Sequence, residues 1–219
     1  MPARKISVVI PALNEDKTVG RVAAEMLASP FVSEVIVVDN GSDDRTSEVA
    51  TRAGATVIRL KERGFGRALK TGFAAARESL IFKIDADMLN ASRQWPGDLL
   101  TLLGSSDGLV KAYWSSSVDP MPITNLVVRP LIRRLFPALA GIRMPLAGIY
   151  LVNKELPELD TMSNGWPFDV EVVLRMHRAG YGIQQKNLGE VIDTYKPVDM
   201  YHEMSWELIS FLLNESGVA

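Results

Sequence analysis

Two carboxylates stand one residue apart at the end of a short, largely apolar run. The run 80–84 (LIFKI) suits a buried strand, and Asp85 and Asp87 follow it directly. On an ideal strand, residues i and i+2 share a face, so the two side chains could converge on one ligand at the carboxyl end of the strand. Open α/β sheets bind ligands at that edge. Two hard oxygen donors there suit Mg²⁺ or Mn²⁺ bridging a nucleotide diphosphate, whereas the plain alternative is a pair of solvated loop carboxylates.

The residues before this pair alternate between strands and helices. Strands are expected at 5–10, 35–38, 56–60 and 80–84, with helices at about 17–28, 46–53 and 67–78 between them. Pro11 ends the first strand, and Gly54 ends the second helix. Because strand–helix–strand crossovers are right-handed, this order predicts an α/β fold with a parallel, doubly wound sheet.

The second half of the chain is less regular. Helices are expected at 95–103, 168–179 and 206–213, and strands at 108–114, 145–152 and 183–188. The stretch 123–139 is apolar and more typical of core than of a partner groove, although it carries Arg129, Arg133 and Arg134. No composition shift marks a linker, so we expect a single domain over 1–219, with a nucleotide-binding half at 1–90 and an irregular half at 91–219.

Composition excludes several classes of function. With 219 residues, 47% hydrophobic and 23% charged, the chain is typical of a globular protein, and a net charge of −2 argues against binding nucleic acid. The absence of cysteine excludes disulfides, thiolate metal sites and thiol nucleophiles, and it fits a cytoplasmic setting. No run approaches the roughly 20 apolar residues that span a bilayer, so we expect no transmembrane segment.

The loop sequences argue against two other classes of nucleotide-dependent protein, the dinucleotide-binding oxidoreductases and the nucleotidyltransferases. The turn Gly64-Phe65-Gly66 follows the third strand and lacks the third glycine of a dinucleotide fingerprint, and the chain has no Walker loop. A nucleotidyltransferase would normally have a glycine-rich, basic loop after its first strand. Here residues 11–15 (PALNE) are acidic and contain no glycine, which disfavours that class.

The order of motifs resembles the GT-A glycosyltransferases of the family-two type, the broad group that includes the dolichyl-phosphate mannose synthases. Five motifs carry this resemblance: VVIPALNE (8–15), VIVVDNGSDD (35–44), GFGRALKTGF (64–73), KIDADM (83–88) and GWPFDVEVVLRMHRAGY (165–181). The second half is most similar to the glucosyl-3-phosphoglycerate synthases, through LVKAYW (109–114), ITNLVVRPLIRRLFPAL (123–139), MPLAGIYL (144–151) and NLGEVID (187–193). The resemblance implies a GT-A fold with a mostly parallel sheet, and an acceptor site in the half 91–219.

The resemblance also implies roles for individual residues. The nucleotide sugar would be bound by Pro11, Ala12, Leu13, Glu15, Asp39, Asn40, Ser42, Arg67, Asp85 and Ala86. The acceptor would contact Thr124, Ala147 and Gly148. Asp169 would face the sugar or the acceptor. Because i and i+2 do not share a face of a helix, Glu171 would then have a structural role.

The metal site departs from the pattern of the resembled synthases. Asp87 is the expected ligand of Mg²⁺ or Mn²⁺ and is counted with Asp169 as a catalytic residue. A histidine completes the site in those synthases, and its position here is Asp193; a carboxylate can also ligate Mg²⁺. His202 lies nearby in the sequence and is the substitute candidate.

Other departures concern the donor and the acceptor. The lysine of the resembled glycine turn is Phe65 here, so any cation for the diphosphate would come from Arg63, Arg67 or Lys70. The arginines that hold the acceptor phosphate correspond to Ser115–Ser116 and Pro122, and a glutamate corresponds to Ile149. Phosphate recognition favours bidentate arginine contacts, so these departures count against 3-phosphoglycerate itself as the acceptor.

The leading hypothesis is a metal-dependent hexosyltransferase. It would transfer a hexose from UDP-glucose or a GDP-sugar to a small hydroxylated acceptor such as a glycerate-type compound, with retention at the anomeric carbon. Transfer to a polyprenyl phosphate at a membrane face is the alternative, with 123–139 as its only candidate surface element. A binding protein without turnover is a third hypothesis, and a homodimer is left open.

Overall fold

The computed structural model describes residues 4–117, 121–155, 157–194 and 198–217. Within these residues, seven strands form one sheet in the order β3-β2-β1-β4-β6-β5-β7. The strands are β1 (Ile6–Ala12), β2 (Val32–Asp39), β3 (Thr56–Arg59), β4 (Leu80–Lys83), β5 (Asp107–Ser115), β6 (Tyr150–Asn153) and β7 (Gly182–Glu190). The α-helices are α1 (Val19–Leu27), α2 (Thr46–Arg52), α3 (Phe65–Ala75), α4 (Trp95–Leu100), α5 (Arg129–Leu135), α6 (Phe168–Arg178) and α7 (Val198–Ser216).

The expected parallel sheet is found in the first half of the chain. Strand β1 pairs in parallel with β2 and with β4, and β2 pairs in parallel with β3. In the second half, β6 runs antiparallel to both β4 and β5, while β7 is parallel to β5. The start of β6 therefore lies at the edge where β4 ends, and Tyr150 is opposite both Lys83 and Lys111. Residues opposite one another in such pairs project to the same face of the sheet, so these three side chains form a row.

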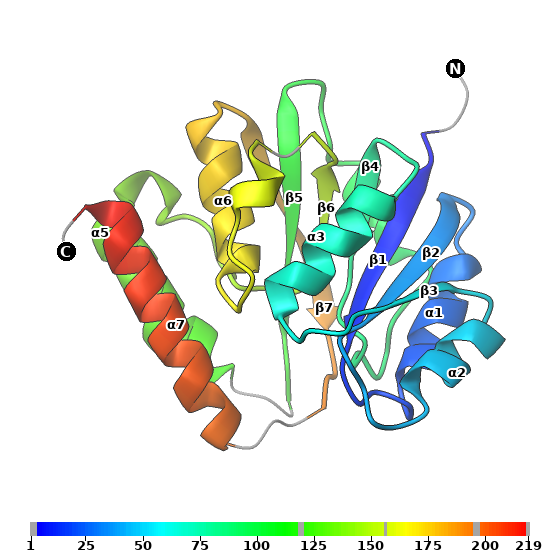
Figure 1. The fold of residues 1–219 in the computed structure, drawn as a ribbon. Helices are drawn as coiled ribbons and strands as arrows, with labels where there is room; N and C mark the ends of the chain where they lie inside the picture. The colour runs from blue at the N-terminus through cyan, green and yellow to red at the C-terminus, as the bar shows by residue number, and fades with distance from the viewer. Residues whose placement is uncertain (1–3, 118–120, 156, 195–197, 218–219) are drawn as a thin grey trace.

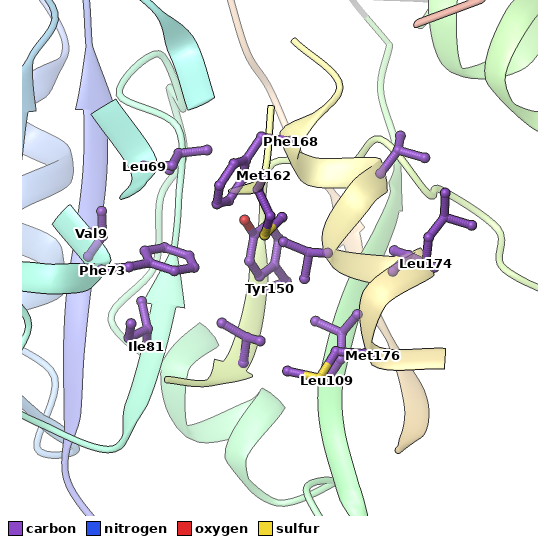
Figure 2. Close-up of a cluster of buried hydrophobic side chains, with 14 of the residues drawn as sticks. Val9, Leu69, Phe73, Ile81, Leu109, Tyr150, Met162, Phe168, Leu174 and Met176 are labelled. Carbon is purple, nitrogen blue, oxygen red and sulfur yellow. The ribbon is translucent and has the colours of Figure 1, made fainter. Parts of the chain in front are cut away.

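Helices cover both faces of the sheet (Figure 1) and bury its inner strands, whereas the edge strands β3 and β7 are only partly buried. On one face α3 and α6 pack on a cluster that includes Phe73, Tyr150 and Phe168, shown in Figure 2. On the other face α1, α2 and α4 pack on a second cluster that includes Val8 and Ile10. Strands buried on both faces read as continuous apolar runs, which is why 5–10 and 35–38 were recognisable as strands.

The largest differences from the expected elements lie after residue 120. The stretch 123–139 forms a π-helix at Ile123–Val128, helix α5 and a 3₁₀ turn at Pro137–Leu139. Pro130 is the second residue of α5, which continues directly from the π-helix. The expected helix 206–213 is the central part of the longer α7, which lies beside α5 at one side of the sheet (Figure 1).

The strand expected at 145–152 begins only at Tyr150, because the residues before it form a turn that enters the site. None of the helices that the structure describes is both long and apolar enough to cross a membrane.

Candidate active site

Asp85 and Asp87 lie in a turn just beyond β4 rather than on the strand, because β4 ends at Lys83. The strand-face argument for their convergence was therefore wrong in its local geometry. Both side chains nevertheless line the same two adjoining cavities, together with Phe65 and Trp166. These two aromatic rings stack with their centroids 5.0 Å apart. We call the two spaces the large cavity, of about 450 Å³, and the small cavity, of about 120 Å³.

The large cavity collects most of the residues expected to bind the nucleotide sugar. Its lining includes Pro11, Ala12, Leu13, Glu15, Asn40, Asp85 and Ala86. The Asn40 side chain also accepts a hydrogen bond from the Gly64 backbone N–H at 2.8 Å, which joins the loop after β2 to the start of α3. Arg63 supplies a cation to the same wall, where it pairs with Asp43 at 2.8 Å.

Three residues expected at the nucleotide do not line either cavity: Asp39, Ser42 and Arg67. Asp39 is buried and accepts hydrogen bonds from the Ser47 hydroxyl and the Ser42 backbone N–H. Burial alone would raise the pKa of Asp39, but these hydrogen bonds outweigh it, so the pKa lies below its ordinary value. Asp39 and Ser42 thus stabilise the loop after β2 through hydrogen bonds and do not line a cavity themselves.

Arg67 forms an ion pair with Glu62 and lines neither cavity. Lys70, the other expected cation, donates to the Met162 carbonyl at 2.8 Å and also lines neither cavity. Of the three cations considered for a diphosphate, only Arg63 lines the large cavity.

The small cavity collects the residues expected at the acceptor. Thr124, Ala147 and Gly148 line it, and Asp169 and Asp193 contribute carboxylates. Gly148 is tightly enclosed, because a Cβ atom at this position would lie 1.6 Å from the Asp85 Oδ2 atom. Glycine is therefore the residue type that lets the turn before β6 approach Asp85.

Lys83 joins the two sides of the site. Its ammonium is fully buried and lies 2.6 Å from Asp85 Oδ1 and 3.0 Å from Asp169 Oδ2. It also faces the Phe65 ring, 4.9 Å from the ring centroid. Burial works against the ammonium, but attraction to Asp169 and Asp85 outweighs it, and the pKa of Lys83 is raised. The lysine therefore stays charged and fixes both carboxylates.

Tyr150 and Lys111 extend this network beneath the small cavity. The Tyr150 hydroxyl donates to Asp169 Oδ1 at 2.8 Å, and burial raises the pKa of that phenol. The Lys111 amine donates to the Ala147 carbonyl at 2.6 Å and lies 4.4 Å from the Tyr150 ring centroid. Burial lowers the pKa of Lys111 to about 7, and the attraction of Asp169 and Asp85 offsets only part of this effect.

Helix α6 directs its two acidic residues to different surroundings, as helical geometry predicts. Asp169 lines the small cavity, whereas Glu171 accepts from the Ser163 backbone N–H at 2.8 Å and pairs with Arg175 at 2.8 Å. Glu171 therefore anchors the 163–166 loop, which carries Trp166 into the site.

The expected metal ligands are only partly brought together. Asp87 and Asp193 line the same cavity, and the Thr194 hydroxyl lies 3.5 Å from Asp87 Oδ2. His202 is exposed on α7 and lines neither cavity. In the described part of the chain, no three His, Cys, Asp or Glu side chains form a metal-binding group. Mg²⁺ usually takes one or two protein carboxylates and completes its shell from phosphate and water, so two aspartates fit such an ion.

Several residues of the site were not predicted. Lys83 and Lys111 had a visible signal, because each interrupts an apolar strand run at a position where a buried side chain is expected. Tyr150 had no such signal in the sequence, because its position beside Lys83 depends on how β6 pairs with β4. Glu203 and Glu207 of α7 line the large cavity, and Glu207 accepts from the Trp166 backbone N–H at 3.0 Å. The approach of these two glutamates to the large cavity depends on how α7 packs against the rest of the fold.

Comparison with known proteins identifies the family of this chain. The model of the family "Glycosyl transferase family 2" matches residues 7–111. The glucosyl-3-phosphoglycerate synthase of Mycolicibacterium smegmatis is 32% identical over 99% of this chain and 79% of its own length. The chain belongs to glycosyl transferase family 2. The predicted family is therefore confirmed, and the protein is a glycosyltransferase.

Solved structures confirm the predicted GT-A fold. The glucosyl-3-phosphoglycerate synthase of Mycobacterium tuberculosis, in complex with Mn²⁺, UDP-glucose and phosphoglyceric acid, superposes with a TM-score of 0.88. It is 32% identical, and the match covers 98% of this chain and 80% of the solved one. The same enzyme has been solved with Mg²⁺ and UDP. The human dolichyl-phosphate beta-glucosyltransferase is 28% identical over 78% of this chain and 63% of its own length.

Proposed function

We propose that this glycosyltransferase transfers a hexose from a nucleotide-diphosphate sugar, with UDP-glucose as the first candidate, to a hydroxyl group of a small acceptor. The reaction depends on Mg²⁺ or Mn²⁺ and retains the anomeric configuration. Glycerate-type compounds are the starting candidates for the acceptor, because the similar mycobacterial enzyme was solved with phosphoglyceric acid.

One observation carries the proposal: Asp85 and Asp87 line both cavities. The large cavity has the loop residues expected at the base and ribose, and the small cavity has those expected at the acceptor. A diphosphate in the large cavity would bring its sugar to the boundary that the two aspartates share. The reacting carbon and the acceptor hydroxyl would then meet at that boundary, which is the positioning that group transfer requires.

The carboxylates at this boundary have different roles. Asp87 and Asp193 would hold the divalent ion, which neutralises charge on the diphosphate leaving group when bound. Arg63 adds a positive charge at the large cavity. Asp85, fixed by Lys83, accepts hydrogen bonds from the ribose or the sugar.

Asp169 orients the sugar rather than attacking it. Its two oxygens already accept hydrogen bonds from Tyr150 and Lys83, which hold the carboxylate in one position and lower its nucleophilicity. Each oxygen retains a second lone pair for a sugar hydroxyl. This arrangement supports retention without a covalent glycosyl–enzyme bond.

Binding and turnover test the proposal directly. Calorimetry with UDP-glucose should detect binding that requires Mn²⁺, and Asp87→Asn should weaken it at least about tenfold, the cost of one lost charged contact. Asp160→Asn is the matched control, because Asp160 is exposed and lines neither cavity. Mass spectrometry of the products should show a hexosylated acceptor. Mn²⁺-independent binding, or unchanged binding by Asp87→Asn, would refute this metal site.

A second candidate acceptor is a polyprenyl phosphate. Arg129, Arg133 and Arg134 line a shallow hollow of about 510 Å³, and the neighbouring Leu126 is 76% exposed. Cations beside an exposed apolar side chain suit an anionic lipid surface. Flotation with vesicles containing an anionic lipid distinguishes the candidates: the small-acceptor proposal expects the protein to stay in the lower fraction.

A further inference from the structure

Helix α7 contributes to the lining of both cavities, although no sequence motif marks it as part of the site. Glu203 and Glu207 line the large cavity, and Tyr201 and Met204 line the small one. All four belong to about two turns of the same helix. The helix is anchored in the core by Leu208, which is fully buried. Helix α7 therefore extends along the boundary where the two cavities adjoin.

Trp166 is the residue through which α7 contacts this boundary. It lines both cavities, and so does Phe65. The two rings stack with their centroids 5.0 Å apart and their planes inclined by 22°. The Lys83 ammonium lies 4.9 Å from the centroid of the Phe65 ring. Aromatic pairs pack in a few preferred geometries, so the position of the Trp166 ring determines the shape of the boundary.

Two glutamates hold the 163–166 loop that carries this ring. Glu171 accepts from the Ser163 backbone N–H at 2.8 Å, at the start of the loop. Glu207 accepts from the Trp166 backbone N–H at 3.0 Å, at its end. A Cβ atom at Gly165 would lie 2.2 Å from Glu207 Oε2, so the missing side chain at Gly165 lets the carboxylate approach the Trp166 amide.

We infer that Glu207 is a positioning residue: it holds Trp166 at the boundary and thereby supports the rate of transfer rather than the affinity for the nucleotide. This inference rests on the proposed function and adds α7 to its site. The base and ribose are expected at Pro11 and Asn40, which belong to other loops. Nucleotide binding therefore does not require the ring, whereas group transfer does, because a misplacement of about 1 Å can lower a rate about a hundredfold.

Turnover distinguishes these two effects. With UDP-glucose, Mn²⁺ and glycerate, Glu207→Ala should lower the kcat of UDP release at least about tenfold and change the KM for UDP-glucose by less than about threefold. Glu207→Gln keeps a carbonyl oxygen that can accept from the Trp166 amide, so its kcat should stay within about threefold of the unaltered protein. Asn214→Ala is the control, because Asn214 is exposed on α7 and lines neither cavity. Equal losses in the alanine and glutamine variants, or a change in KM alone, would contradict the inference.

A double variant separates positioning from a general loss of stability. In Trp166→Ala the ring is absent, so adding Glu207→Ala should lower kcat no further, whereas additive losses would show that Glu207 acts elsewhere. Gly165→Ala gives an independent perturbation, because its Cβ would displace the Glu207 carboxylate. It should reproduce the kcat loss of Glu207→Ala, and an unchanged kcat would contradict the inference.

Near-UV circular dichroism tests the position of the ring without any acceptor. This signal depends on fixed aromatic packing. Glu207→Ala should lose the band that Trp166→Phe loses, and Glu207→Gln should keep it. A wild-type band in Glu207→Ala would overturn the inference. Absence of Mn²⁺-dependent UDP-glucose binding by the unaltered protein would instead overturn the proposed function, and the spectra would still decide whether Glu207 positions Trp166.

Discussion

Replacing Lys83 by methionine removes an ammonium that forms ion pairs with both Asp85 and Asp169. The substitution keeps a similar length and volume but deletes the ammonium, which is fully buried. The Asp169 carboxylate, itself only 3% exposed, then faces the site with Tyr150 as its one remaining neighbour in this network. We expect a large loss of both stability and activity.

The distances set the size of the stability loss. At an effective dielectric constant of 20, two unit charges 4 Å apart interact by about 4 kcal/mol, and both contacts of Lys83 are shorter, at 2.6 and 3.0 Å. The cost of burying the lysine offsets part of this attraction. Removing one partner of a buried pair typically destabilises a protein by about 3–5 kcal/mol, which we expect for Lys83→Met.

Urea denaturation measures the free energy of unfolding. Lys61→Met is the matched control, because Lys61 is exposed, and it should change stability by less than about 0.5 kcal/mol. Adding Asp169→Asn to Lys83→Met should recover at least about 1 kcal/mol, because the amide removes the uncompensated charge. The pKa of Lys83 is raised, so its contribution is fully present below the ordinary lysine value of 10.5, and the loss should be equal at pH 7 and pH 9. A loss below about 1 kcal/mol, or no recovery in the double variant, would refute the reasoning.

Three further variants test other parts of the site. Gly148→Ala should lower kcat by about a hundredfold, because its Cβ would displace Asp85 from its contact with Lys83; unchanged kcat would show that the turn adjusts. Asp193→Ala should raise the Mn²⁺ concentration needed for half-maximal activity, whereas an unaltered titration would exclude Asp193 as a ligand. Lys111, with a pKa lowered to about 7, binds its proton more weakly when folded than when unfolded. Between pH 7 and 10 its contribution therefore makes the protein more stable as pH rises, by at most about 1.4 kcal/mol per unit, and Lys111→Met should remove that slope in urea melts.

The first half of the fold was predictable because its signals are local. Strands β1, β2 and β4 contain short apolar runs, β3 has Val57 and Ile58 at its centre, and each of the four is followed by a turn and a helix. The parallel order then follows from the handedness of crossovers. The antiparallel β6 was not predictable in this way. Its four residues pair with β4 and β5, which are distant in the sequence, and no local pattern specifies that register.

The candidate site likewise contains residues that local motifs identify and side chains whose positions depend on the folded chain. The residues of the first loop and the aspartates after β4 were found because short motifs contain them, and they line the cavities. Asp39 and Ser42 belong to an equally clear motif, but the Asp39 side chain accepts from the Ser42 backbone N–H and the Ser42 hydroxyl accepts from the Asn14 backbone N–H of the loop after β1. A motif identifies the loop, whereas the direction of each side chain depends on hydrogen bonds that only the folded chain forms.

The row formed by Lys83, Tyr150 and Lys111 depends both on the local sequence of the strands and on contacts that only the folded chain forms. Three polar side chains at one level of a buried sheet would be unfavourable unless each had a partner. Their partners come from elsewhere: the Asp169 carboxylate from α6 and the Ala147 carbonyl from the turn before β6. An apolar row would fill the same space at lower cost, so the polar row is better explained by the site than by stability. It fixes Asp85, Asp169 and the 147–148 turn at the boundary of the two cavities, where a transferred sugar would have to be held.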